Sequence, residues 1–174
     1  MSSRDLIVVD LETGGLHDGA VILEVAAVNV STGKTLTFVP HVSREKVAAA
    51  SPEALQVNRY YERGVWRNAL HSQEATRPYW NDLRTLLDGN TFAGSNPTFD
   101  SRLLARVVPV SWHHRLADLA AYAAGKLHID PTELPGLAAV CELLDVENTA
   151  PHTALGDALA TAECFRILAA VRLP

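Results

Sequence analysis

The sequence has 174 residues, of which 48% are hydrophobic and 20% are charged. This length and composition are typical of one globular domain with a sizeable core, here residues 1–174, and exclude a disordered chain. The 15 basic and 20 acidic side chains give a formal charge of −5, which excludes nucleic-acid binding through a broad basic face. No apolar stretch has the length of a membrane span, and Asp10 interrupts the apolar N-terminal run. We therefore expect a cytoplasmic protein with neither a signal peptide nor a membrane partner.

The first predicted strand leads directly into a pair of carboxylates. An apolar, largely β-branched run from Leu6 to Val9 is followed by Asp10, and two glycines after Thr13 indicate a turn. Side chains two residues apart on a strand point to the same face, so Asp10 and Glu12 project together. Two adjacent carboxylates repel each other unless a positive charge lies between them. A hard divalent cation with oxygen ligands would relieve this repulsion, and two solvated acids at a strand end are the alternative.

Two further strands follow after short connections. Residues 21–30 form a strongly apolar segment that contains Glu24, and residues 34–39 alternate polar and apolar side chains after a turn at Gly33. A parallel crossover needs a dozen or more residues, so the first three strands are predicted to form an antiparallel meander. We interpret Glu24 as a structural acid bonded to backbone or to a cation, with metal ligation as the alternative.

Helices dominate from Ser51 onward. Pro52 suits a first helical position, and a longer helix is predicted from near Ser72 to Leu87, with Pro78 as a kink or as its true start. Aromatic and basic side chains are interleaved between these helices, namely Arg59, Tyr60, Tyr61, Arg63, Trp66 and Arg67. Such a pattern can line a channel for a single strand of nucleic acid, although it is more often an ordinary surface.

The next segment carries an aspartate to the start of a helix. A short strand over residues 91–94 leads into Asn96-Pro97-Thr98-Phe99-Asp100, after which apolar residues keep helical spacing. A fifth strand is predicted over residues 112–116, followed by a helix from Asp118 that ends by Gly125.

Two more helices complete the predicted chain, the last of them beginning near Thr153. His152 lies just before this helix, and Asp157 lies in its first turns. Cys141 and Cys164 occupy apolar helical patterns without a Cys-x-x-Cys spacing, which indicates buried free thiols. Strands that come first and then alternate with helices predict an α/β sandwich in three layers. Its mixed five-stranded sheet would have its first strands antiparallel and its later strands parallel.

The acidic residues gather at the ends of these predicted elements. Asp10 and Glu12 are in the first strand, Asp100 opens one helix and Asp157 opens another. From the loop before the last helix, His152 can converge on them. Four carboxylates can hold two divalent cations, of which one activates water and the other stabilises the leaving oxygen. A histidine with a pKa near neutrality can take the proton from that water. The set therefore suits two-metal hydrolysis of phosphodiesters.

Three segments resemble the exonuclease boxes of the DnaQ-like 3′→5′ exonucleases, and more narrowly those of the DEDDh subgroup. They are Asp10-Leu11-Glu12-Thr13, Asn96-Pro97-Thr98-Phe99-Asp100 and His152-Thr153-Ala154-Leu155-Gly156-Asp157. The boxes follow the family order, and the resemblance covers nearly the whole chain. It implies an RNase H-like fold and an enzyme that releases nucleoside 5′-monophosphates from the 3′ end of nucleic acid.

The resemblance also implies a role for each matching residue. Asp10 would bridge two Mg²⁺ or Mn²⁺ ions, and Glu12 and Asp157 would complete one of the two sites. Asp100 would bind the second ion directly or through water, and His152 would be the general base. Three residues would contact the terminal nucleotide, namely Thr13 through its backbone, Leu16 as an apolar wedge against the base, and Phe99 nearby.

Some positions depart from the family pattern. Asn58 and Arg59 stand where many relatives have a His-Gly pair, so that substrate contact is not carried over. Relatives of the oligoribonuclease type usually carry an arginine soon after the third-box aspartate, whereas Ala158-Leu159-Ala160 follows Asp157 here. This difference favours DNA over RNA, and an exoribonuclease with the same chemistry is the alternative.

Two other classes of function are compatible with part of the pattern. One is a catalytically inactive binding module docked on a DNA polymerase, which the intact acids and histidine argue against. The other is a hydrolase of small phosphate esters, which leaves the box from Asn96 to Asp100 unexplained. The sequence does not decide between an independent enzyme and a proofreading subunit in DNA replication or repair, nor between monomer and dimer.

Overall fold

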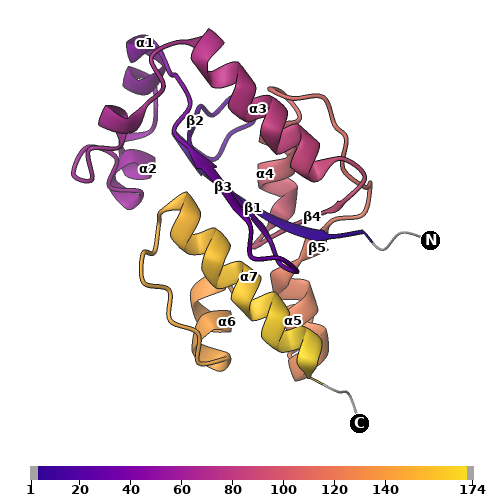
Figure 1. Cartoon of the computed structure of the whole chain (residues 1–174). Coiled ribbons are helices and arrows are strands. Elements are labelled where there is room, and N and C mark those ends of the chain that lie inside the picture. Colours follow the sequence, from indigo (N-terminus) through magenta and orange to yellow (C-terminus); the bar gives the residue numbers. More distant parts are fainter. Residues whose placement is uncertain (1–3, 172–174) are drawn as a thin grey trace.

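A mixed β-sheet forms the centre of the protein (Figure 1). The computed structural model describes residues 4–171. Its strands are β1 (Leu6–Thr13), β2 (Ile22–Asn29), β3 (Thr35–Phe38), β4 (Thr91–Gly94) and β5 (Ala117–Asp118). Within residues 4–171 they form one five-stranded sheet in the order β3-β2-β1-β4-β5. The first three strands are antiparallel neighbours, and β4 is parallel to both β1 and β5, as predicted.

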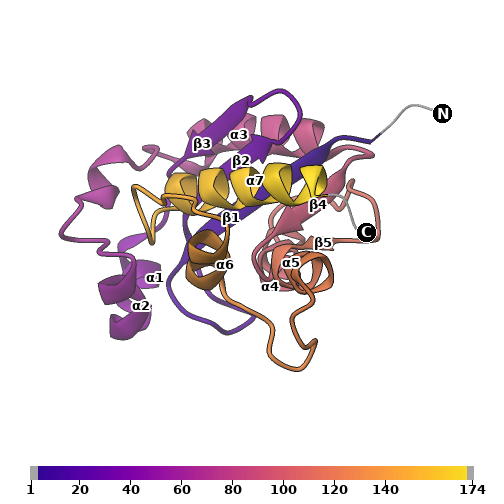
Figure 2. The same cartoon turned by 90° about the horizontal axis from the view of Figure 1, so that it is seen from below.

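Helices cover both faces of this sheet. They are α1 (Arg44–Ala48), α2 (Pro52–Val57), α3 (Gln73–Leu87), α4 (Pro97–Leu104), α5 (Leu119–Leu127), α6 (Leu137–Leu143) and α7 (Ala154–Ala170), with a 3₁₀ turn, η1, at Val65–Asn68. On one face α7 packs against β1 and β2, with α5 and α6 beside it. On the other face lie α3 and α4, so the molecule has three layers (Figures 1 and 2). This confirms the predicted α/β sandwich.

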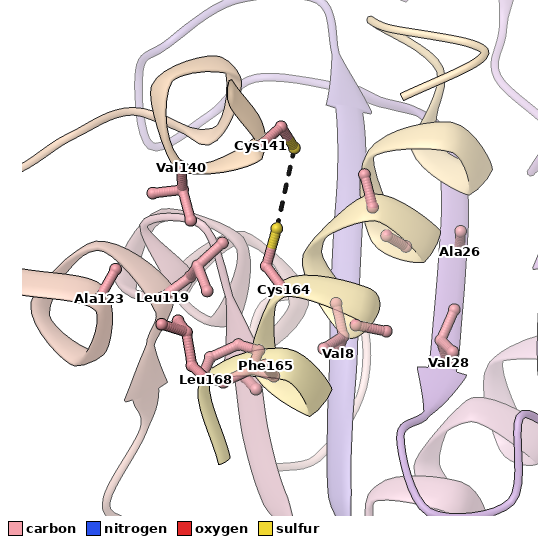
Figure 3. Packing of buried hydrophobic residues seen from close by; sticks show 14 of the residues in the cluster. Val8, Ala26, Val28, Leu119, Ala123, Val140, Cys141, Cys164, Phe165 and Leu168 are labelled. Atoms are coloured by element: carbon pink, nitrogen blue, oxygen red, sulfur yellow. Dashed lines mark hydrogen bonds between the residues drawn. The ribbon is translucent and has the colours of Figure 1, made fainter. Parts of the chain in front are cut away.

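Strand β1 supplies side chains to both hydrophobic layers because its residues alternate between the two faces. Val8 packs under α7 with Phe165 and Leu168 (Figure 3). Ile7 and Val9 face the opposite way, into a cluster that includes residues of α3 and α4. A strand buried on both faces reads as a continuous apolar run, which is why β1 was recognisable in the sequence.

Most helices begin at the side chain that the sequence indicates. Ser51, Ser72, Asp118 and Thr153 each accept a hydrogen bond from the backbone N–H three residues later, so each is an N-cap. Pro78 lies inside α3, which begins before it at Gln73. Helix α1 has no counterpart among the predicted elements.

The fifth strand was predicted in the wrong place. The segment over residues 112–116 is irregular, and β5 consists only of Ala117 and Asp118. Trp112 packs its ring 5.3 Å from that of Phe92, and the His113 N–H donates to the carbonyl of Asn90. The apolar residues here are therefore buried by a loop, a tertiary arrangement that alternation alone does not distinguish from a strand. Helix α5 also extends to Leu127, two residues past Gly125.

The two cysteines are buried free thiols, as predicted (Figure 3). Cys141 on α6 and Cys164 on α7 have their Sγ atoms 3.8 Å apart and belong to the cluster between these helices and the sheet. Apolar surroundings raise the pKa of both thiols, that of Cys164 to about 12. Across residues 4–171, no helix combines the length and the apolar character needed to cross a membrane.

Candidate active site

Three carboxylates converge on one point beside the sheet. Asp10 and Glu12 project from the same face of β1, and Asp157 approaches them from the first turn of α7. One carboxylate oxygen of each residue lies within 4.8 Å of the other two. The structure thus brings together residues that are about 145 positions apart in the chain, because α7 packs across β1 and β2.

Asp100 reaches the same region from α4. Strands β4 and β1 are parallel neighbours, so the helix that follows β4 begins beside the carboxyl half of β1. The Asp100 carboxylate is buried, and its Oδ1 accepts a hydrogen bond of 3.0 Å from the backbone N–H of Leu11. This bond fixes Asp100 against the strand segment between Asp10 and Glu12.

Burial raises the pKa values of three of these acids. It raises the pKa of Asp10 well above its usual range, and the neighbouring charges of Asp100, Glu12 and Asp157 raise it further. Burial is also the main cause that raises the pKa of Glu12 to about 7, followed by the charges of Asp157 and Glu24. It raises the pKa of Asp100 to about 7, against the opposing effect of the Leu11 N–H. These three carboxyls are therefore harder to ionise at neutral pH than carboxyls in water.

The donor set fits a hard divalent cation. Every converging side chain offers carboxylate oxygens, which are the ligands preferred by Mg²⁺ and Mn²⁺. A bound cation would also supply the positive charge that the buried acids lack.

These pKa shifts predict how the stability of the protein depends on pH and metal. A carboxyl with a raised pKa binds more protons in the folded than in the unfolded state, so its contribution to stability is lost as pH rises from about 4.5 to about 7. In EDTA, the melting temperature should therefore fall between about pH 5 and pH 8. Mg²⁺ or Mn²⁺ should oppose this fall, because metal binding requires the ionised acids. Thermal melts across this pH range test the prediction, and a pH slope that metal leaves unchanged would contradict it.

The segment before α7 is held against Asp157. The Oδ2 atom of Asp157 accepts a hydrogen bond of 3.2 Å from the backbone N–H of His152. The Oδ1 atom of Asp157 accepts one of 2.6 Å from the Asn148 side chain. His152 has a left-handed backbone with φ of 59°, and the residue is exposed. The loop therefore brings His152 beside Asp157, which a regular helix could not do at this spacing. The sequence carries no signal for the role of Asn148.

Gly156 allows this loop to lie close to the helix. A Cβ atom at this position would lie 2.1 Å from the carbonyl oxygen of Ala150, which is closer than any real contact. The same carbonyl accepts a hydrogen bond from the Thr153 hydroxyl, whose oxygen in turn caps Gly156. The glycine between His152 and Asp157 thus has a steric reason, which becomes visible only when the loop is folded back on α7.

Arg63 connects the segments that surround the acids. Its guanidinium binds both carboxylate oxygens of Glu24, at 2.6 and 2.9 Å. It also donates to the backbone carbonyls of Asn58, at 2.8 Å, and of His152, at 3.1 Å. The predicted structural role of Glu24, as an acid bonded to a cation, is therefore observed. Sequence reasoning placed Arg63 only within an interleaved aromatic and basic stretch and missed this link to His152.

A hollow of about 350 Å³ adjoins the acids, and we call it the site hollow. Glu12, Thr13, Leu16 and Phe99 line it, together with α2 residues and Asn58. Leu16 lies in the loop between β1 and β2 and is 85% exposed. The three residues that the resemblance assigns to the terminal nucleotide thus lie around one hollow beside the carboxylates.

The aromatic and basic side chains between Arg59 and Arg67 do not line this hollow, whereas Asn58 does. Asn58 is buried, and its side chain donates to the carbonyl of Thr13 and accepts from the N–H of Tyr60, so it supports the loop. Tyr60 is buried against Leu23 and Val65. Tyr61 and Trp66 are exposed, but neither lines the site hollow. Most of the aromatic and basic stretch is therefore structural or general surface.

Comparison with known proteins identifies the class of this protein. The model of a family described as exonuclease matches residues 7–165. No curated protein sequence shows significant similarity. Among solved structures, E. coli exonuclease I in complex with a 5cy-dA13 oligonucleotide is similar, with a TM-score of 0.74 and 18% identity over 99% of this chain and 41% of that chain. A product-bound exonuclease I has a TM-score of 0.71 and 15% identity, over 96% of this chain and 43% of that chain. An ExoI/SSB-Ct complex has a TM-score of 0.72 and 15% identity, over 98% of this chain and 42% of that chain.

The mixed sheet and its flanking helices form an RNase H-like fold, and the family match makes the chain a member of an exonuclease family. More specifically, the chain belongs to the DnaQ-like exonuclease family of DEDDh type. It spans about two fifths of the length of the exonuclease I chains that it resembles.

Proposed function

We propose that this protein is a metal-dependent 3′→5′ exonuclease that acts on single-stranded DNA and releases nucleoside 5′-monophosphates. The observation that carries the proposal is the convergence of Asp10, Glu12 and Asp157 within 4.8 Å, with Asp100 bonded to the same strand. In an exonuclease family, a cluster of carboxylates beside a hollow lined by Leu16 and Phe99 supports hydrolysis of a phosphodiester by way of divalent ions.

Four carboxylates would be the ligands of two Mg²⁺ or Mn²⁺ ions. Asp10, at the centre of the cluster, would hold both ions, while Glu12 and Asp157 would complete one site and Asp100 would complete the other. When bound, the ions lower the pKa of a water molecule and neutralise charge on the leaving oxygen. The hydrogen bonds from Asn148 and from the His152 N–H keep Asp157 oriented toward the cluster.

His152 is the proposed general base. Its imidazole accepts the proton as the water oxygen bonds to phosphorus and the bond from phosphorus to the 3′ oxygen of the preceding nucleotide breaks. The products are a nucleoside 5′-monophosphate and a strand with a new 3′-hydroxyl. The exposed position of His152 beside Asp157 lets the base reach the water and then return its proton to solvent.

The site hollow holds the terminal nucleotide. Leu16 and Phe99 provide apolar surface for the base, and the backbone of Thr13 binds the 3′-hydroxyl. Two observations favour DNA over RNA as the substrate. The first is that no arginine follows Asp157 in the next three residues. The second is that a structure of similar fold, E. coli exonuclease I, was determined with a 5cy-dA13 oligonucleotide.

The proposed setting is cytoplasmic DNA metabolism. Residues 1–174 would act as one exonuclease domain, trimming 3′ ends in replication or repair, alone or beside a DNA polymerase. A structural neighbour is described in an ExoI/SSB-Ct complex, which makes proteins that coat single strands a further class of partner to test.

Arg63 should influence turnover through His152. A lysine at this position cannot bind both Glu24 oxygens and two carbonyls at once, because it offers a point charge instead of a planar fork. Displacement of a catalytic group by about 1 Å can cost 10²-fold, so we expect kcat to fall about tenfold in Arg63→Lys with little change in KM. Steady-state kinetics on an oligonucleotide measure both values.

The double variant Arg63→Gln/Glu24→Gln separates positioning from folding. It removes both charges of the partly buried pair, so it avoids the cost of leaving Glu24 without its partner. A folded double variant should still have a low kcat, because a glutamine cannot span Asn58 and His152. Wild-type kcat in folded Arg63→Lys would contradict the positioning role.

The direct test of the proposed function uses strands labelled at the 5′ end. DNA and RNA of one sequence are incubated with the protein in Mg²⁺, Mn²⁺ or EDTA, with Asp10→Asn as the control. We expect a metal-dependent ladder that shortens from the 3′ end and is absent with the control, with DNA degraded faster than RNA. Faster degradation of RNA would indicate an exoribonuclease instead. Absence of any ladder would refute the proposed exonuclease activity.

A further inference from the structure

A second hollow lies across the β1–β2 loop from the site hollow. Its volume is about 370 Å³, within the usual range of small-molecule pockets. Its apolar wall includes Trp80, Leu103 and Val107. The larger polar side chains that line it are His17, His41, Lys46, Gln73 and Arg106. Lys46 and Arg106 are the positively charged members of this set. We call it the basic hollow.

The charge of the basic hollow is opposite to that of the protein as a whole. Among the described residues that line it there is no carboxylate, although the sequence has 20 acidic side chains against 15 basic ones. Lys46 and Arg106 are exposed, and neither forms an ion pair within residues 4–171. The nearby Asp18 is neutralised by Arg102 at 2.9 Å. Lys46 and Arg106 are therefore available to an anionic ligand.

One of the two histidines adds a donor to the hollow. His17 accepts the N–H of Gly19 at its Nδ1, so its Nε2–H can donate to a ligand. The Nδ1–H of His41 donates to the carbonyl of Leu70 at 3.1 Å, so the Nε2 of the neutral ring is an acceptor. A hollow lined both by cationic side chains and by aromatic and aliphatic ones is suited to a nucleotide, whose phosphate and base need these two kinds of contact.

Three segments lie between the two hollows and contribute to the lining of both. The β1–β2 loop places Leu16 at the site hollow and His17 at the basic hollow, and α4 does the same with Phe99 and Leu103. The short segment before α2 is the third, and its Ser51 N–H donates to the carbonyl of Gly14 at 2.8 Å. Figure 2 shows the loop running between α2 and α4. The two hollows are therefore neighbours on either side of the β1–β2 loop, in which Leu16 is exposed.

We propose that the basic hollow binds the part of a single strand that lies immediately 5′ of the terminal nucleotide. Lys46 and Arg106 bind its phosphates, and a base lies against Trp80 and Val107. The inference rests on the proposed function, because it takes the site hollow to hold the 3′-terminal nucleotide. It explains how an acidic protein can retain a polyanion, since the positive charge is concentrated beside the site.

The test compares substrates that do and do not carry phosphates into the basic hollow. A dinucleotide without a terminal phosphate contains only the scissile phosphate, whereas a dodecanucleotide extends well beyond it. In Lys46→Gln/Arg106→Gln, the KM for the dodecanucleotide should rise about tenfold at low salt, and the slope of log KM against log salt should decrease by about 1.4, as expected for two lost phosphate contacts on a single strand. The kcat and the KM for the dinucleotide should stay at wild-type values.

A matched control removes the same charge elsewhere. Lys34 and Arg84 are exposed and lie away from both hollows, so Lys34→Gln/Arg84→Gln should leave both KM values unchanged. An unchanged KM for the dodecanucleotide in the Lys46/Arg106 variant would overturn the inference. So would an equal rise in the control, or an equal rise for the dinucleotide.

Failure of the proposed function can be told apart from failure of this inference. If the wild-type protein cleaves neither substrate, the function is wrong, and fluorescence anisotropy of a labelled dodecanucleotide in EDTA then examines the basic hollow alone. Weaker binding by the Lys46/Arg106 variant than by wild type and control would still support the inference. Equal binding by all three proteins would refute it.

Discussion

Replacement of Asp10 by asparagine is expected to lower kcat on a DNA oligonucleotide by about 10³-fold or more. Asp10 is the most central acid of the cluster, with burial and the charges of Asp100, Glu12 and Asp157 all acting on it. Metal stabilisation of the transition state is worth several kcal/mol, and about 1.4 kcal/mol corresponds to a factor of ten in rate. Loss of the ligand that both ions share should therefore remove most of the rate enhancement. Single-turnover assays in saturating Mg²⁺ measure the effect.

The same variant should change stability in a direction that distinguishes a metal site from a structural acid. Asparagine removes a buried charge that other acids repel, so in EDTA at neutral pH Asp10→Asn should melt at a higher temperature than wild type. The rise in melting temperature that Mg²⁺ or Mn²⁺ produces should then be absent. Glu142→Gln removes an exposed acid on α6 and is the matched control, with a wild-type response to metal. An equal metal response in Asp10→Asn would contradict the assignment.

The second large effect is expected at His152. Loss of a general base typically costs about 10²–10⁴-fold, and we expect His152→Gln to lower kcat within that range. The carboxylates are untouched, and the backbone N–H of His152 that binds Asp157 is kept by any side chain. The metal-induced rise in melting temperature should therefore survive in this variant, which separates catalysis from metal binding.

The control for His152 is another exposed histidine. His114 lies in the loop before β5 and lines neither hollow, so His114→Gln should have wild-type kcat and KM. His152→Gln with undiminished turnover would remove this residue from the mechanism. A variant that instead loses its response to metal would show that the loop, and not the imidazole, is what the substitution disturbs.

Much of the acidic cluster could be predicted because its members sit at positions with local signatures. The period of two in β1 places Asp10 and Glu12 on one face whatever surrounds the strand. The caps at Asp118 and Thr153 likewise follow from side chains that bond the backbone three residues away. The approach of His152 to Asp157 was harder to predict, because it depends on the left-handed backbone of His152 in the loop before α7.

The supporting contacts could not be predicted. Arg63 binds Glu24 and the His152 carbonyl, which are 39 and 89 positions away in the chain. Asn148 bonds Asp157 only because the loop folds back on α7, and the same fold makes Gly156 necessary. The wrong placement of the fifth strand has a similar origin. Trp112 packs on Phe92 from a loop, and its apolar character alone does not distinguish a loop from a strand.

The sequence by itself determined the layered fold, the positions of most helix starts and the acids that form the cluster. These follow from periodicity, capping and the three boxes, each of which is contained in a short segment. Only the tertiary structure decided which groups orient those acids, and that Lys46 and Arg106 share a hollow with His17. The physical reason is that such contacts join segments far apart in the chain, so they arise from the packing of helices on the sheet and leave no local pattern.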